Sequence, residues 1–114
     1  MPIKIIKDTI SRRELKDIAE NQFGDLVKVV VDIEKEIMAI GGELHADEEA
    51  RLLQNGSLQE NLWGINLYTD KSNGDFVGFD SMINIRPAQG NKSRNVESLD
   101  IQRKIRDIIS KLIL

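Results

Sequence analysis

The sequence of 114 residues contains no cysteine, which excludes disulfides, thiolate zinc sites and cysteine nucleophiles. Aromatic residues make up only 4% of it, so Ile, Leu and Val must build most of any core. Apolar runs are short: none approaches the roughly 18 residues of a membrane-spanning helix, and the N-terminal MPIKIIKD lacks the apolar stretch of a signal peptide. We therefore expect a cytoplasmic protein with no membrane association.

The residues that are present have the composition of one globular domain. Hydrophobic residues make up 40% and charged residues 31%, and we expect a single domain over residues 1–114. The formal net charge of −3 argues against nonspecific nucleic-acid binding. Residues 83–114 nevertheless carry seven basic and three acidic side chains, a local balance of +4 that leaves −7 for the rest. This polarity fits either an anion-binding face or mutual attraction of the two halves.

Local patterns in the first half predict a helix and then a hairpin. Ser11 and Glu14 have the spacing of a capping box, in which each side chain satisfies a backbone N–H at a helix start, so we expect a helix over about residues 12–22. Residues 25–33 and 37–40 are rich in β-branched side chains and are joined by a short charged connection. This pattern predicts two paired strands.

The second half again pairs helices with a hairpin. We expect a short helix over residues 47–54. Residues 62–68 alternate apolar and polar side chains, and a polar turn then leads to a return strand over about residues 76–86 with a bend near Ser81. From 99 to 113, apolar side chains at helical spacing predict an amphipathic final helix.

Together these elements predict an α+β fold. We expect an antiparallel sheet of about four to five strands, built from two hairpins and an edge strand at residues 3–6, with the helices packed on one face. The last and longest of these helices is the amphipathic C-terminal one. Trp63, the only tryptophan, is expected in the core, although an exposed Trp63 would offer a platform for stacking a base or ring.

The only histidine, His45, lies among carboxylates in GGELHADEEA, residues 41–50; the carboxylates are Glu43, Asp47, Glu48 and Glu49. On a helix His45 and Glu49 would share a face, as metal ligands or an acid/base pair do. However, the second histidine of the zinc-peptidase helix motif and the spacing of a calcium loop are both missing. The pattern therefore favours a strand-to-helix junction, and we expect no metal.

A basic loop, NIRPAQGNKSRN, follows the predicted return strand at residues 84–95. Its two guanidinium groups, its glycine and the helix start that follows are what recognition of phosphate or carboxylate needs. It is neither a P-loop nor a dinucleotide fingerprint, and no motif indicates a cofactor. A solvated loop, whose arginines pair with the acidic first half, explains the pattern equally well. As candidate ligand-binding residues we take Glu43, His45, Arg86, Asn91, Ser93 and Arg94.

Three functions fit these residues. The first is binding of a small anionic ligand, such as a nucleotide, or of a protein partner through residues 41–49 and 84–95. The alternative is a small phosphodiester hydrolase or nuclease, with His45 as general base and Arg86 and Arg94 holding the phosphate. It requires the two segments to meet in space. The third is an interaction module, such as a homodimer joined through a strand edge or the last helix.

Three stretches resemble a small prokaryotic family catalogued only as a domain of unknown function. They are GGELHADEE at residues 41–49, LWGINLY at 62–68 with the preceding Gly56-Ser57, and INIRPAQGNKSR at 83–94. Thr69 departs from the proline expected after the tyrosine, a change in a turn. The resemblance implies a compact stand-alone cytoplasmic protein, and it implies no reaction, substrate or cofactor.

Overall fold

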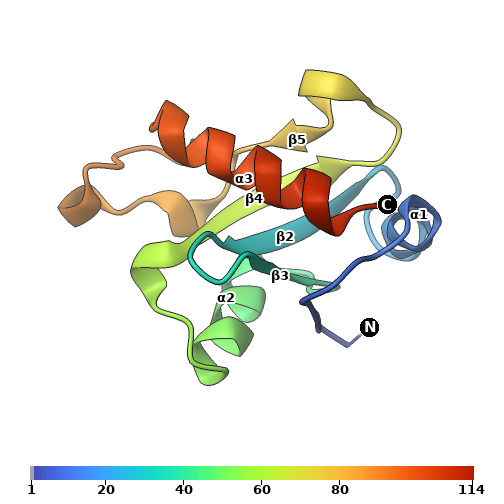
Figure 1. Cartoon of the computed structure of the whole chain (residues 1–114), viewed down its shortest axis with the longest axis horizontal. Helices are drawn as coiled ribbons and strands as arrows, with labels where there is room; N and C mark the ends of the chain where they lie inside the picture. The colour runs from blue at the N-terminus through green and yellow to red at the C-terminus, as the bar shows by residue number, and fades with distance from the viewer. Residues whose placement is uncertain (1) are drawn as a thin grey trace.

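The computed structural model describes residues 2–114, which form a five-stranded antiparallel sheet and three α-helices (Figure 1). The sheet order is β1-β3-β2-β4-β5. The strands are β1 (Lys4–Ile6), β2 (Leu26–Asp32), β3 (Ile37–Ile40), β4 (Leu62–Tyr68) and β5 (Val77–Gly78). The helices are α1 (Arg12–Asn21), α2 (His45–Gln54) and α3 (Leu99–Leu112). The predicted α+β class, antiparallel sheet and C-terminal helix are confirmed.

Helices α1 and α3, the two longer helices predicted from the sequence, begin at side-chain caps. The Ser11 hydroxyl accepts a hydrogen bond from the Glu14 N–H at 3.1 Å, and the Ser98 hydroxyl accepts one from the Ile101 N–H at 3.2 Å. Each cap satisfies one of the N–H groups that a helix start leaves without a partner. None of the helices in residues 2–114 combines the length and the apolar content that crossing a membrane requires.

Strand β2 is buried on both faces, and this places the helices on both sides of the sheet. Val27, Val29 and Val31 join the main core beneath α1 and α3, whereas Val30 packs with Leu52 of α2 in a smaller cluster on the other face. Figure 1 shows α3 across the front of the sheet, away from α2. The expectation that all helices share one face was therefore wrong in the placement of α2. A central strand that is apolar on both faces needs cover on both.

The return strand is shorter than expected. Strand β5 pairs with β4 over only two residues, and a 3-10 turn, η3 (Met82–Asn84), follows a break at Ser81. The Asn84 side chain replaces the missing strand: its Oδ1 accepts from the Gly64 N–H at 2.8 Å and its Nδ2 donates to the Gly64 carbonyl at 2.9 Å. One side-chain amide thus satisfies both backbone groups of Gly64, so that no further strand is needed there.

Candidate functional site

A cleft of about 370 Å³ opens on the α2 face of the sheet, and side chains from both predicted segments line it. Its floor comes from β2 and β4, one wall from the start of α2 and the other from residues 80–83. We call it the His45 cleft. Its polar lining residues are Lys28, His45, Asn66, Tyr68, Asp80, Ser81 and Arg94. The sequence-predicted residues His45 and Arg94 therefore line the same cleft, although they are far apart in the chain.

His45 lies in the first turn of α2 with its ring half-buried against β4. Its Nε2 atom is 2.7 Å from the carbonyl oxygen of Ile65. A carbonyl can only accept, so Nε2 carries the proton and Nδ1 keeps its lone pair. Burial lowers the pKa of His45, and the hydrogen bond to Ile65 opposes this only in part. The imidazole is therefore neutral at pH 7.

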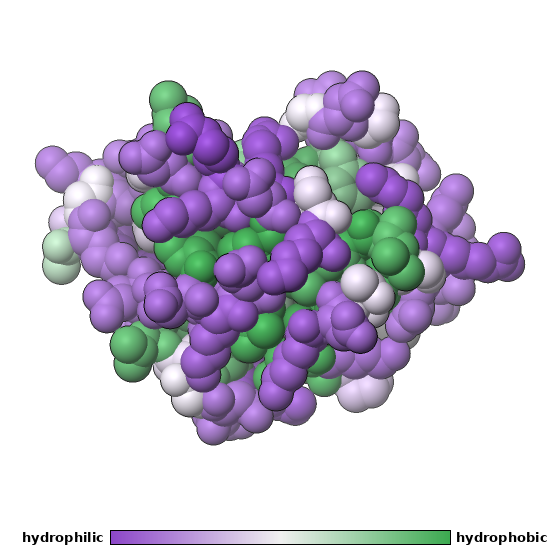
Figure 2. Space-filling model, in the orientation of Figure 1, coloured by the Kyte–Doolittle hydropathy of each residue, from purple (hydrophilic) through white to green (hydrophobic). Residues whose placement is uncertain are grey.

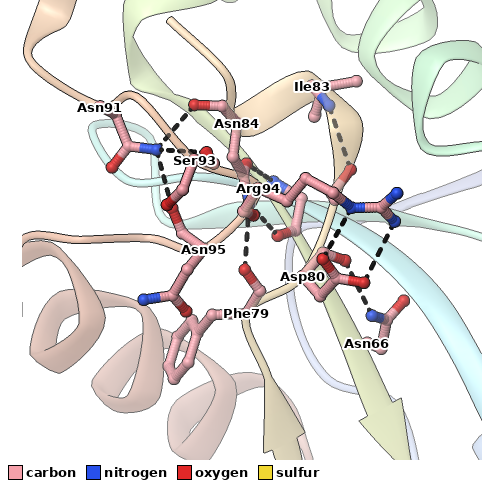
Figure 3. Close-up of polar contacts among 11 residues, drawn as sticks. Asn66, Phe79, Asp80, Ile83, Asn84, Asn91, Ser93, Arg94 and Asn95 are labelled. Carbon is pink, nitrogen blue, oxygen red and sulfur yellow. Dashed lines mark hydrogen bonds and ion pairs between the residues drawn. The ribbon is translucent and has the colours of Figure 1, made fainter.

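Arg94 lies at the mouth of the cleft, paired with a carboxylate (Figure 3). Its Nε is 2.8 Å from Asp80 Oδ1 and its Nη2 is 3.1 Å from Asp80 Oδ2, a two-point contact between half-exposed side chains. The Asn66 side chain donates to the Asp80 backbone carbonyl at 2.9 Å, which ties this pair to the floor of the cleft. Such exposed pairs contribute little stability, so a competing anion can displace Asp80 at small cost.

Arg86 lies outside the cleft. Its guanidinium group donates to the backbone carbonyls of Gln59, Leu62 and Ile83, and it stacks 4.3 Å over the ring of Trp63. Trp63 belongs to the main core, as expected from its strand position. The structure therefore separates Arg86 from His45 and uses it to join segments that are distant in sequence.

Asn91 and the backbone around it organise the basic loop (Figure 3). Asn91 Nδ2 donates to the carbonyls of Asn84, Ser93 and Asn95, and its Oδ1 accepts from the Glu97 N–H at 2.8 Å. All four of these contacts are internal. In this structure the side chain of Asn91 thus points into its own loop.

The hydrogen-bond donors around Ser93 already bind a carboxylate of the chain itself, that of Glu97. The N–H groups of Lys92 and Ser93 and the Ser93 hydroxyl all donate to Glu97 Oε2, at 2.9, 2.8 and 2.7 Å. These hydrogen bonds lower the pKa of Glu97, led by the one from the Ser93 hydroxyl. The loop is therefore suited to an anion, as its sequence suggests, and its own carboxylate fills it.

Glu43 is exposed and does not line the cleft, whereas Glu48 is completely buried. Glu48 Oε2 accepts from the Gly42 N–H at 3.0 Å, and Oε1 is buried without a partner. Burial raises the pKa of Glu48 to about 9, so this carboxyl is protonated at pH 7. Within residues 2–114 no group of three or more His, Asp or Glu side chains is placed to hold a metal ion.

Sequence reasoning did not include the other polar lining residues of the cleft, among them Lys28 and Asn66, in the candidate site. These two are cross-strand partners in the register of β2 with β4, and both side chains project to the α2 face. Each is a polar residue within an otherwise apolar strand, and this could have marked both residues as site candidates from the sequence. Their meeting depends on the pairing register, which the sequence alone does not determine.

The chain belongs to the family described as "Protein of unknown function (DUF5674)", whose model matches residues 4–112. This confirms the resemblance to a family of unknown function. Neither the curated proteins nor the solved structures gave a match. The family description names no reaction or ligand, so the geometry of the chain has to carry the functional argument.

Proposed function

We propose that this member of a family of unknown function binds a small anionic ligand in the His45 cleft. The observation that carries the proposal is that the two predicted segments contribute to one cleft: His45 comes from residues 41–49 and Arg94 from residues 84–95. Lys28 adds a second cation on the floor. A volume of about 370 Å³ is within the usual range of small-molecule sites.

The charges in the cleft favour an anion. Lys28 and Arg94 are cationic, Asp80 is anionic and His45 is neutral, which leaves one net positive charge when the Arg94–Asp80 pair is intact. A ligand phosphate or carboxylate between Lys28 and Arg94 would gain two charge-assisted contacts. The guanidinium group of Arg94 can donate two parallel hydrogen bonds to such a ligand, and the ammonium group of Lys28 supplies a mobile point charge.

The lip of the cleft favours a ligand with an apolar or ring-shaped body. Leu44 and Met82 line the cleft and are 55% and 65% exposed, unusually open for such large apolar side chains. A ligand that covered them would gain hydrophobic contact beside the charged groups. A nucleotide meets both requirements, as do other anionic metabolites with a ring.

A thermal-shift titration at low salt tests this proposal. Adenosine monophosphate and phenyl phosphate should raise the melting temperature by about 5 °C or more at a concentration of roughly 100 Kd, because both bind only the folded chain. Inorganic phosphate, without a ring, should raise it less. Lys28→Met combined with Arg94→Gln should abolish the shift.

Arg103→Gln combined with Lys104→Gln is the matched control for that experiment, because it also removes two positive charges and neither residue lines the cleft. Arg103 pairs with Asp100 at the exposed start of α3, and the double variant should leave the shift unchanged. A melting temperature that no anion raises would refute the proposal. An equal loss in this control variant would also refute it, since the binding would then depend on overall charge alone.

Phosphodiester hydrolysis is the second candidate, and the neutral His45 favours it. A neutral imidazole can act as general base at pH 7, and Arg94 lines the same cleft. Lys28 would take the place that the sequence hypothesis gave to Arg86. Turnover of bis(4-nitrophenyl) phosphate should then disappear in His45→Gln while the circular dichroism spectrum is kept. A wild-type chain without turnover rules this candidate out.

A further inference from the structure

A second groove lies on the opposite face of the sheet from the His45 cleft, between α1, α3 and the turn before β5. It consists of two adjoining hollows of about 410 and 570 Å³, and Arg12 and Phe76 line both of them. We call it the α1–α3 groove. In Figure 2 apolar surface shows between hydrophilic side chains where these elements come together.

The floor of the α1–α3 groove is an opening onto the main core. Leu15, Phe76, Val77, Ile109 and Ile113 all line it and all belong to the main core cluster. Because α1, α3, β5 and the residues next to them hold these side chains in the core, the floor has a fixed shape. It offers apolar contact to whatever lies in the groove without any rearrangement of the chain.

Cationic side chains stand above this floor. The Arg12 guanidinium lies 4.8 Å from the centre of the Phe76 ring, and the Arg106 guanidinium lies 5.0 Å from the centre of the Phe79 ring. Stacking holds a guanidinium by its flat face and leaves its N–H edge able to donate. Arg13 and Lys16 line the α1 end of the same groove.

The positive charge of this groove is only partly offset among residues 2–114. The ion pairs found among residues 2–114 use other cations, so no carboxylate of that part of the chain lies within 4.0 Å of Arg12, Arg13, Lys16 or Arg106. The acidic lining residues are Asp17 and Glu20, both at the α1 end. Arg106 donates to the Gly74 carbonyl at 3.4 Å but has no carboxylate partner among the described residues. In a chain with a net charge of −3, four cations against two acidic side chains in one groove indicate an acidic occupant.

We propose that the α1–α3 groove binds an acidic peptide segment of a partner protein that also carries apolar side chains. The groove is open and crosses two helices and a turn, which suits an extended or helical segment better than a small molecule that must be enclosed. Carboxylates of the segment contact Arg12 and Arg106, and its apolar side chains contact Phe76 and Ile109.

Fluorescence anisotropy with a short fluorescein-labelled peptide of alternating Glu and Leu tests this proposal. The wild-type chain should bind it, and the Arg12→Gln, Arg106→Gln double variant should bind at least about tenfold more weakly, because charge-assisted contacts are lost. A peptide with Gln in place of Glu should bind as weakly to the wild type. Melting curves should show that the variant is folded.

The matched control is Arg103→Gln with Lys104→Gln, which removes the same charge from α3 outside the groove and should keep the affinity within about threefold. Lys28→Met should also bind normally, which separates this groove from the His45 cleft. Equal weakening in the control, or no binding by the wild type, overturns the proposal. A wild-type dimer that the groove variant converts to a monomer also overturns it, since the occupant is then a second copy.

Discussion

Glu48 is a carboxylic acid held in the interior by one hydrogen bond. Its neighbour on one side is Gly42, where even a Cβ atom would come within 2.8 Å of Glu48 Cγ, so the Gly-Gly turn closes directly over it. Burial raises its pKa from 4.5 to about 9. An acidic residue near a helix start normally stabilises that start as an anion, and here burial keeps the carboxyl protonated although the hydrogen bond from the Gly42 N–H favours the anion.

We expect the free energy of unfolding to fall as the pH rises from about 5 to 9. Between pH 4.5 and about 9 the folded chain holds a proton on Glu48 that the unfolded chain has lost, so each increase in pH favours unfolding. Glu48→Gln removes this dependence and should be more stable than the wild type by about 1–3 kcal/mol at pH 7. Urea denaturation across this pH range measures both effects.

Glu43→Gln is the control for this experiment, because Glu43 is an exposed acid in the same segment. Its stability should change with pH in parallel with the wild type. If the Glu48→Gln curve also ran parallel to the wild type, Glu48 would be ionised in the folded chain and its protonation would not contribute.

Among the elements, the packing of the η3 turn on β4 depends on a glycine. A Cβ atom at Gly64 would lie 2.6 Å from both Cβ and Oγ of the buried Ser81, closer than such atoms ever approach. The absence of a side chain at Gly64 lets the turn approach β4, and Asn84 can then bond the Gly64 backbone. The η3 turn thus takes the place of a longer strand beside β4, and it can do so only because residue 64 is a glycine.

Gly64→Ala should therefore destabilise the fold by about 2 kcal/mol or more, since the turn must move and Asn84 loses its hydrogen bonds to the strand. Ser81→Gly in the same chain should recover part of the loss by making room for the new Cβ. Gly74→Ala is the control, because nothing lies within 4 Å of a Cβ there, and it should change stability by less than about 1 kcal/mol. Equal losses at Gly64 and Gly74 would contradict this packing argument.

Across the whole molecule, one sheet serves two clusters of apolar side chains. The main core lies beneath α1 and α3 and the smaller cluster beneath α2, and alternate residues of β2 and β4 contribute to both. Neither cluster can be lost without exposing one face of these strands. We therefore expect the chain to unfold in one cooperative transition.

Truncation in either cluster should lower the same transition. Ile105→Ala in the main core and Leu52→Ala in the smaller cluster each remove a completely buried side chain and should each cost about 2–5 kcal/mol. Tryptophan fluorescence follows Trp63 in the main core, and far-ultraviolet circular dichroism follows the helices. Their denaturation curves should coincide in both variants. A Leu52→Ala curve that shifts by circular dichroism alone would show that α2 unfolds separately.

The sequence by itself determined the elements and their order. The helix over 12–22 and the final helix over 99–113 were predicted to within one residue at each end, because caps and apolar stripes act between residues a few positions apart. The first hairpin followed from β-branched runs, and the start of the second followed from the alternation over residues 62–68, for the same reason. The prediction of a return strand over residues 76–86 was wrong in its length. The strand stops early because the Asn84 side chain bonds the backbone of Gly64, twenty residues away in the sequence.

Only the tertiary structure decided which side chains share a site. His45 and Arg94 line one cleft, Arg86 donates to carbonyls near Trp63, and Glu97 accepts from the backbone N–H groups of the loop. Each outcome depends on strand register or on which face of the sheet an element covers, and contacts between distant residues set both. The sequence could therefore name some of the candidate residues, such as His45 and Arg94, whereas the full set and the directions of the side chains followed only from packing.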